Sequence, residues 1–437
     1  MSKGSWILTI ALLAVAVAMV TAACGDERAM TTFARATPRS GAELSRAVLA
    51  DLPAAPRDGL TREVPLEDPS GHALDRFRDA LDRAAHGERV ARIVAYGGSH
   101  TASDHWTGAL RSRLQAQFGD AGHGFVLPVP PITSYWQRGV RIEDAEGWTV
   151  LSPSSKRPDV ERYGIAGIAF EAHEPAWAEI ATDGSTASRI EVMFLRQPGG
   201  GALEVVIDGT AHTISTAGER EEAATAVFAV PDGAHRVRLR TRDAAPVRIY
   251  GAVMEREVRS GVVVDQLGLA GAKARHQLHW DEEVWSPLIR TRAPDLLLLS
   301  YGNNETDDRH LQHDQHEAHF VAMIERLQRT FPEASCVVVG PSDRNYPGPE
   351  ATWKTPSLLA WLVDMQRRVA LARGCAFFDT LAWQGGTGAV DRWLTADPPL
   401  ERDDRIHFSE QGYRRLGEAL LRALLAEGPD RASVAER

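Results

Sequence analysis

The sequence has very little cysteine. Only three cysteines occur in 437 residues, at Cys24, Cys336 and Cys375. No Cys-x-x-Cys pair is present, and no Cys/His spacing is typical of a structural zinc site. We therefore expect no structural zinc module.

An excess of positive charge is also lacking. The 49 Lys and Arg residues are outnumbered by 59 Asp and Glu, which gives a net charge of −10. Without a basic stripe we expect no nucleic-acid partner. The hydrophobic content of 43% and charged content of 25% are ordinary for a soluble globular protein. A chain of this length suggests two or three domains.

The N-terminus has the pattern of an export signal. Residues 7–20 form a run of apolar and small residues after the positive charge of Lys3. That run has the length of a signal-peptide core and is too short for a comfortable membrane span. Thr21-Ala22-Ala23-Cys24 resembles a bacterial lipoprotein processing site, although Thr21 replaces the usual leucine. We expect residues 1–24 to be a signal peptide and Cys24 to carry a lipid anchor to a membrane; the alternative is ordinary cleavage nearby.

Cys336 and Cys375 each open a predicted strand. If the two strands are neighbours, a disulfide can form in an oxidising compartment. Two buried free thiols are the other interpretation, and from the sequence alone we favour it.

Strands and helices alternate in two separated parts of the chain. A strand at 89–96 is followed by a glycine turn and a helix with apolar residues at steps of four. The alternation resumes after residue 261, with further strands at 262–264, 295–300, 336–339 and 375–378. This pattern predicts an α/β domain with a parallel sheet, formed by residues 71–129 and 262–428.

The intervening residues have a different pattern. Several short predicted strands are separated by turn signals such as Pro198-Gly199-Gly200-Gly201 and Asp208-Gly209. This spacing is typical of a β-sandwich or jelly roll. We therefore predict a β domain at 130–261, inserted into a loop of the α/β domain. Residues 25–70 are predicted to be a tether with a short helix at 41–52, and 429–437 a tail.

Four short segments carry candidate chemistry. Ser99 lies in a sharp turn between a strand and a helix, where a hydroxyl is exposed and a backbone N–H can face an oxyanion. Asn304 and Gly271 follow two other strands, and can offer an amide and an N–H at the same sheet edge. Asp404 precedes His407 by three residues, a spacing that lets its carboxylate orient the imidazole as a base. Each signal alone is weak, because such turns more often cap a helix or shape a loop.

Together these segments resemble the conserved blocks of the SGNH/GDSL hydrolase superfamily. The resemblance covers about 70–128 and 262–427. It implies a flavodoxin-like fold, a triad of Ser99, His407 and Asp404, and an oxyanion hole formed by the Ser99 N–H, the Gly271 N–H and the Asn304 side chain. It also implies that the chemistry needs no metal or other cofactor. The chain departs from the usual Gly-Asp-Ser block, because Gly98 stands where the aspartate belongs. Asp403, beside Asp404, leaves the choice of the acid slightly open.

A narrower resemblance is to bacterial peptidoglycan O-acetylesterases. It is carried by 99–104, 107–108, 118–125 and 385–389, with Arg392-Trp393 shortly after. Members of that group have an inserted domain similar to carbohydrate-binding modules. The resemblance implies an exported serine esterase that removes O-acetyl groups from an acetylated cell-envelope glycan. The alternatives are an esterase for another acylated polysaccharide or a lipid, and an inactive glycan-binding envelope lipoprotein.

Two further groups of residues are weighed against plainer interpretations. His310, His313, His316 and His319 recur at steps of three, which spreads them around half of a helix, so a solvated face is favoured over a metal site. The aromatic side chains of Tyr135, Trp136 and Trp148 could stack on sugars, but residues of this kind are more often part of a core.

Overall fold

A computed structural model describes residues 40–132, 135–153, 162–308, 310–347 and 352–426. The predicted signal peptide, Cys24 and the tail at 429–437 lie outside the described residues. Among the helices that are described, none is long and apolar enough to cross a membrane.

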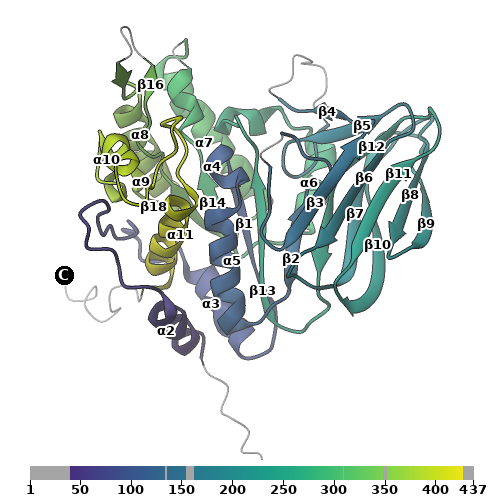
Figure 1. Cartoon of the computed structure of the whole chain (residues 1–437), viewed down its shortest axis with the longest axis horizontal. Helices are drawn as coiled ribbons and strands as arrows, with labels where there is room; N and C mark the ends of the chain where they lie inside the picture. The colour runs from purple at the N-terminus through teal and green to yellow at the C-terminus, as the bar shows by residue number, and fades with distance from the viewer. Residues whose placement is uncertain (1–39, 133–134, 154–161, 309, 348–351, 427–437) are drawn as a thin grey trace, which may run out of the picture. The chain divides into compact units, whose positions relative to one another are not determined.

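A five-stranded parallel sheet forms the centre of the α/β part (Figure 1). Its strands lie in the order β13-β1-β14-β15-β18, so the first strand in the sequence lies between the second and the third. This is the flavodoxin-like order, and the predicted α/β fold is confirmed. The strands are β1 (Val90–Gly97), β13 (Gly261–Gly268), β14 (Leu296–Ser300), β15 (Ser335–Val339) and β18 (Ala376–Phe378).

Helices cover both faces of this sheet, which explains why its strands are apolar on both sides. Ile93 and Val264 pack into a core with the helices of one face, whereas Val94 and Leu267 pack into the core of the other face. The first face is covered by α3 (Asp75–Ala85), α5 (His105–Phe118) and α11 (Glu410–Leu425). The second is covered by α6 (Glu282–Arg290), α7 (His313–Thr330) and α8 (Leu359–Ala372).

Two antiparallel sheets pack as a β-sandwich, as predicted. One has the order β10-β7-β12-β5-β4, with β2 also paired to β12, and the other has the order β3-β6-β11-β8-β9. Val192 of one sheet and Leu239 of the other belong to the same buried cluster. The strands are β2 (Gly122–Val126), β3 (Val140–Glu146), β4 (Thr149–Leu151), β5 (Ala169–Ala172), β6 (Trp177–Thr182), β7 (Ala187–Arg196), β8 (Ala202–Ile207), β9 (Thr210–Ser215), β10 (Glu222–Gly233), β11 (Arg236–Thr241) and β12 (Val247–Glu255).

The sandwich and the parallel sheet are joined by buried charges. The guanidinium of Arg292 is almost fully buried and contacts Asp265 of β13 and Glu255 of β12. Asp265 also accepts a hydrogen bond of 2.8 Å from the N–H of Phe125 in β2. β2 lies before residue 130, where we placed the start of the insertion, and yet it pairs with β12 of the sandwich.

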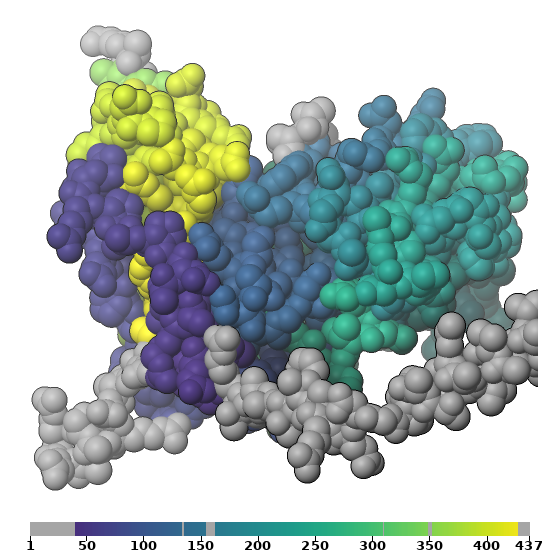
Figure 2. Space-filling model, turned by 60° about the horizontal axis from the view of Figure 1, so that its bottom comes forward, coloured from purple at the N-terminus to yellow at the C-terminus, as the bar shows by residue number. Residues whose placement is uncertain are grey.

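Residues 40–70 do not behave as the predicted tether. The predicted helix is present as α2 (Gly41–Asp51), capped by Ser40, but Leu44 and Val48 are buried against the α/β part. Asp58 pairs with Arg415 of α11. Figure 2 shows this segment, in purple, lying against the yellow C-terminal residues. The tether interpretation was wrong here because apolar residues four apart give α2 a packing face.

The two cysteines of the α/β part form a disulfide. β15 and β18 are neighbours in the sheet, and the Cα atoms of Cys336 and Cys375 are 4.6 Å apart with their sulfurs bonded. Our preference for free thiols was therefore wrong. The sequence could not show that these strands are adjacent.

Candidate active site

Three turns meet at the carboxyl edge of the parallel sheet. Gly97, the last residue of β1, is in register with Gly268 of β13 on one side and Ser300 of β14 on the other. The Gly98 N–H donates to the Ser300 carbonyl at 3.3 Å, and the Leu269 N–H donates to the Gly97 carbonyl at 3.0 Å. These bonds hold the turns before Ser99, Gly271 and Asn304 together.

Glycine permits the close packing of this edge. A Cβ atom at Gly268 would lie 2.5 Å from the backbone nitrogen of Ala102, and one at Gly98 would lie 2.6 Å from Nδ2 of Asn304. The short helix α4 (Ser99–Ala102) can therefore sit directly on the strand ends. The same contact explains Gly98: the Asn304 amide occupies the space that a side chain would need.

Ser99, His407 and Asp404 form a continuous hydrogen-bonded chain. Ser99 Oγ lies 2.7 Å from Nε2 of His407, and Nδ1 of His407 lies 2.7 Å from Oδ2 of Asp404. Because an ionised carboxylate can only accept, Nδ1 carries the proton and Nε2 accepts from the serine. The imidazole is thus arranged to remove a proton from Ser99.

Asp404 is fixed by the residues that follow it. Its Oδ1 accepts hydrogen bonds of 2.9 Å from the N–H groups of Ile406 and His407. Burial alone would raise the pKa of Asp404, but these bonds and the His407 ring outweigh burial and lower that pKa. Asp404 is therefore the carboxylate that orients His407; the contact that defines this role is made by Asp404 and not by Asp403.

The other oxyanion candidates lie on the two turns that are tied to the turn before Ser99. Gly271 has a positive φ of 75°, and the turn ends with the Ala272 N–H donating to the Leu269 carbonyl. Nδ2 of Asn304 donates to the Ala272 carbonyl at 2.9 Å. An amide nitrogen has two hydrogens, so one remains for an oxyanion.

Glu305 joins the Asn304 turn to the Gly271 turn, a role that our sequence analysis missed. Its side chain is buried and accepts from the Ala274 N–H at 2.7 Å and the Gly302 N–H at 2.9 Å. Both donors lie in turns that hold candidate oxyanion groups. No spacing signals this role, because it depends on turns that are about thirty residues apart in sequence.

Asp104 is the second residue whose role the sequence did not show. It is fully buried, where it pairs with Arg111 and accepts from Thr107 and from the Arg138 N–H. Asp104 has a positive φ of 48° and separates α4 from α5, which we had predicted as one helix. Its carboxylate supports the turn after Ser99 and does not contact the triad.

His100 lies behind the triad and stays neutral. Its ring lies 5.4 Å from that of His407, and its Nδ1 is 3.1 Å from the Tyr413 hydroxyl. Burial, followed by the charges of His407 and Arg344, lowers the pKa of His100 to about 3. A neutral ring at this position packs against His407 without adding a charge.

Glu401 is a buried acid beneath the same loop. Burial, with the charges of Asp404 and Asp343, raises its pKa to about 9, so the carboxyl group is protonated at neutral pH. Glu401 pairs across a short bridge with Phe408, and the neighbouring Arg402 N–H donates to the His407 carbonyl at 2.8 Å. Glu401 thus lies under the segment that carries the triad base.

The histidine series before and within α7 is not uniformly solvated. His316 is buried and lies near Trp361, and His313 stacks on the same indole with ring centroids 4.1 Å apart. The expectation of a solvated face is therefore wrong for His316, because Trp361 of α8 covers it. No group of three potential ligands that could hold a metal occurs among the described residues.

The three aromatic residues near the insertion have different surroundings. Tyr135 is buried and its hydroxyl accepts from Nε2 of Gln137 at 2.5 Å. Trp148 is partly buried against the sandwich core. Trp136, in contrast, keeps 41% of its surface exposed.

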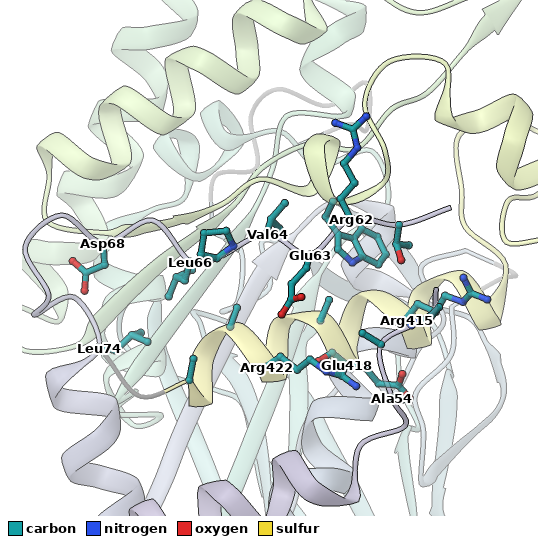
Figure 3. A pocket seen from close by; sticks show the side chains of 18 of the residues that line it. Ala54, Arg62, Glu63, Val64, Leu66, Asp68, Leu74, Arg415, Glu418 and Arg422 are labelled. Carbon is teal, nitrogen blue, oxygen red and sulfur yellow. Dashed lines mark hydrogen bonds between the residues drawn. The ribbon is translucent and has the colours of Figure 1, made fainter. Parts of the chain in front are cut away.

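A cavity of about 760 Å³ lies elsewhere, between residues 54–78 and helix α11. Figure 3 shows Val64 and Leu66 on one side of it, with Glu418 and Arg422 of α11 on the other. None of its lining residues belongs to the candidate active site. The chemistry that we describe therefore does not take place in this cavity.

The sheet order and the serine, histidine and aspartate at its edge define the class of SGNH hydrolases. Residues 233–415 match the family model of the GDSL-like lipase/acylhydrolases. These residues thus carry a GDSL-like acylhydrolase domain, which makes the protein an SGNH esterase. The matched range includes Gly271, Asn304, Asp404 and His407, whereas Ser99 precedes it and is brought to them by the fold.

One solved structure agrees with this fold. A peptidoglycan O-acetylesterase structure is 24% identical and aligns over 82% of this chain and 97% of its own, with a TM-score of 0.68. A family two carbohydrate esterase from Cellvibrio japonicus is 11% identical over 65% of this chain and 97% of its own, with a TM-score of 0.27. The comparison with curated proteins finds no match.

Proposed function

We propose that this esterase uses Ser99 as its nucleophile to remove O-acetyl groups from a cell-envelope glycan, with peptidoglycan as the first candidate. The observation that carries the proposal is the hydrogen-bonded chain from Ser99 through His407 to Asp404. A serine hydroxyl is a weak nucleophile until an adjacent base accepts its proton.

The reaction has two halves that use the same groups. Ser99 Oγ attacks the acetyl carbonyl while Nε2 of His407 accepts the serine proton and returns it to the leaving sugar oxygen. His407 then removes a proton from water, which attacks the acetyl-serine; the bond between the acetyl carbon and Ser99 Oγ breaks, His407 returns the proton to Oγ, and acetate is released. Asp404 stabilises the imidazolium in both halves.

The tetrahedral intermediate needs donors for its oxyanion. We assign this role to the N–H groups of Ser99 and Gly271 and to the Asn304 side chain, which lie on three turns tied to one sheet edge. Removing one such donor typically lowers kcat by about a hundredfold or more.

The glycan part of the proposal is supported by the fold. The structure with the TM-score of 0.68 is that of a peptidoglycan O-acetylesterase, and it aligns over nearly its whole length. That likeness includes the inserted sandwich, since the alignment covers 82% of this chain.

We further propose that the protein is exported and works in the bacterial cell envelope, anchored through a lipid on Cys24. The signal-like residues 1–24 motivate this proposal. The Cys336–Cys375 disulfide supports it, because structural disulfides persist mainly in oxidising compartments outside the cytoplasm. Mass spectrometry of membrane fractions tests it, with Cys24→Ala as the variant that should lose the lipid.

The function is tested by measuring acetate release from O-acetylated peptidoglycan, acetylated xylan and a small chromogenic acetyl ester. We expect the wild type to release acetate from peptidoglycan most efficiently and Ser99→Ala to be inactive on all three. Ser103→Ala is the matched control and should remain active. Preference for xylan, or for a lipid ester, would replace the proposed substrate; silence on every ester with retained glycan binding would identify a binding protein.

A further inference from the structure

Two exposed tryptophans are linked to the candidate active site through intervening side chains. Among the described residues, the large hydrophobic side chains that are clearly exposed are Ile132, Trp136, Val227 and Trp353. Trp136 and Trp353 each keep 41% of their surface exposed. An exposed indole offers a flat apolar face beside a polar N–H group, which suits a ligand with an apolar face and a polar edge.

Trp353 is attached to the loop that carries the triad acid. It lies in β17 (Trp353–Lys354), which pairs with β16 (Tyr346–Pro347) as a short hairpin. The guanidinium of Arg405, the residue after Asp404, lies 4.8 Å from the indole centroid. The Asn345 N–H, just before the hairpin, donates to the Arg405 carbonyl at 2.8 Å. The indole is thus held against the residue that follows Asp404.

Trp136 is connected to the triad base through a series of rings. Its centroid lies 5.1 Å from that of His105, which stacks on Tyr413 at 5.6 Å. Tyr413 contacts His100, and His100 lies 5.4 Å from His407. Arg138 lies over the Trp136 ring at 5.6 Å. This indole is therefore held in place from the His100 side of the site.

The two indoles approach the site from different elements. Trp353 lies in β17 of the short hairpin, whereas Trp136 precedes strand β3, which begins at Val140. Trp353 is linked to the residue after Asp404. Trp136 is linked to His407 through the ring of His100. Each indole is thus connected to the groups around Ser99 from a different part of the chain.

We propose that Trp136 and Trp353 are stacking platforms for two sugar rings that flank the acetylated sugar, so that the enzyme acts within a polysaccharide chain. This inference rests on the proposed function and adds to it. The flat apolar face of a sugar suits an indole, and a polar hydroxyl rim remains in water. A lipid or a free monosaccharide would not engage both indoles at once.

The test measures KM and kcat of each tryptophan variant on O-acetylated peptidoglycan and on a small chromogenic acetyl ester. Trp136→Ala and Trp353→Ala should each raise KM for O-acetylated peptidoglycan by about tenfold relative to any change for a chromogenic acetyl ester, since aromatic contacts are worth up to about one factor of ten. kcat on the polymer should change far less than KM. Trp136→Phe and Trp353→Phe should restore most of the loss. Val227→Ala, an exposed residue of β10, is the control and should alter neither substrate.

The outcomes separate this inference from the proposed function. If both alanine variants match the wild type on the polymer, the stacking platforms are wrong while the esterase activity stands. If the wild type hydrolyses only the small ester, peptidoglycan is not its substrate. The stacking platforms are then tested by the binding of Ser99→Ala to insoluble acetylated peptidoglycan. If Trp136→Ala and Trp353→Ala weaken this binding, the result supports the platforms. If there is no binding, or if both substitutions leave it unchanged, the platforms are wrong.

Discussion

Ser99 Oγ lies 2.7 Å from Nε2 of His407, although 308 residues separate them in the chain. The contact exists because β1 ends at the carboxyl edge of the parallel sheet just before Ser99, and the loop before α11 brings His407 to the same edge. Gly97 is paired to both neighbouring strands, so the turn before Ser99 is fixed from two sides.

The position of the acid leads to a prediction with a built-in control. Asp404→Asn should lower kcat by roughly a thousandfold or more, because an amide cannot stabilise the imidazolium and favours the wrong tautomer. Asp403→Asn should leave kcat near that of the wild type. The measurement is steady-state hydrolysis of a chromogenic acetyl ester. Equal losses in both variants would contradict the assignment of Asp404.

The pH dependence of Asp404 follows from the lowered pKa. Since its pKa is below the ordinary 3.8, the ionised carboxylate stabilises the fold above that value, and the contribution is lost only as the pH falls through the lower folded-state pKa. Asp404→Asn should therefore remove part of the stability at pH 5 and little at the acid extreme. Chemical unfolding across this range checks the sign.

We predict that the Asn304 amide can keep its position only if residue 98 has no side chain. Gly98→Ala should lower kcat by about tenfold or more, since its Cβ would displace an amide that lies 2.6 Å away. In an Asn304→Ala background the same change should cost little, because the neighbours are coupled. Gly233→Ala, where a Cβ meets nothing within 4 Å, is the control. Additive losses in the double variant would show that Gly98 acts in another way.

Glu401 is predicted to make the fold less stable as the pH rises. Its folded-state pKa of about 9 exceeds the ordinary 4.5, so between these values the unfolded chain releases a proton that the folded chain keeps. Glu401→Gln should remove this pH dependence. Relative to that of the wild type, the free energy of unfolding of the variant should rise by on the order of 1–3 kcal/mol between pH 5.5 and pH 8. Unfolding free energies at both pH values test this, with the exposed Glu219→Gln as control. Parallel pH profiles for wild type and Glu401→Gln would disprove it.

The disulfide is predicted to stabilise the sheet. Cys336 and Cys375 are 39 residues apart in sequence, and a loop of this size corresponds to about 3–4 kcal/mol. A reducing agent should lower the Tm of the wild type but not that of the double variant Cys336→Ala/Cys375→Ala. An unchanged wild-type Tm on reduction would mean that the bond contributes nothing.

The sequence predicted the parallel sheet well because its signals are local. The leucine run of β14 and the valines of β13 and β15 indicate buried strands directly. The residues at their ends, Ser99 and Asn304, then follow from the rule that parallel strands end at one edge.

What the sequence did not predict depends on tertiary contacts. Glu305 bridges two turns, Glu401 is buried under the Asp404 loop, and His316 is covered by Trp361. The burial of a polar residue is set by elements from elsewhere in the chain, which periodicity does not report. The same holds for the disulfide, which depends on which strands are neighbours.

The role of Ser99 as a nucleophile can be measured directly by labelling with a fluorophosphonate probe, followed by peptide mass spectrometry. The account predicts one phosphonylated residue, Ser99, with labelling abolished in Ser99→Ala, strongly reduced in His407→Ala and retained in Ser103→Ala. An active wild-type enzyme that is labelled at another residue, or a Ser99→Ala variant that keeps its esterase activity, would contradict it.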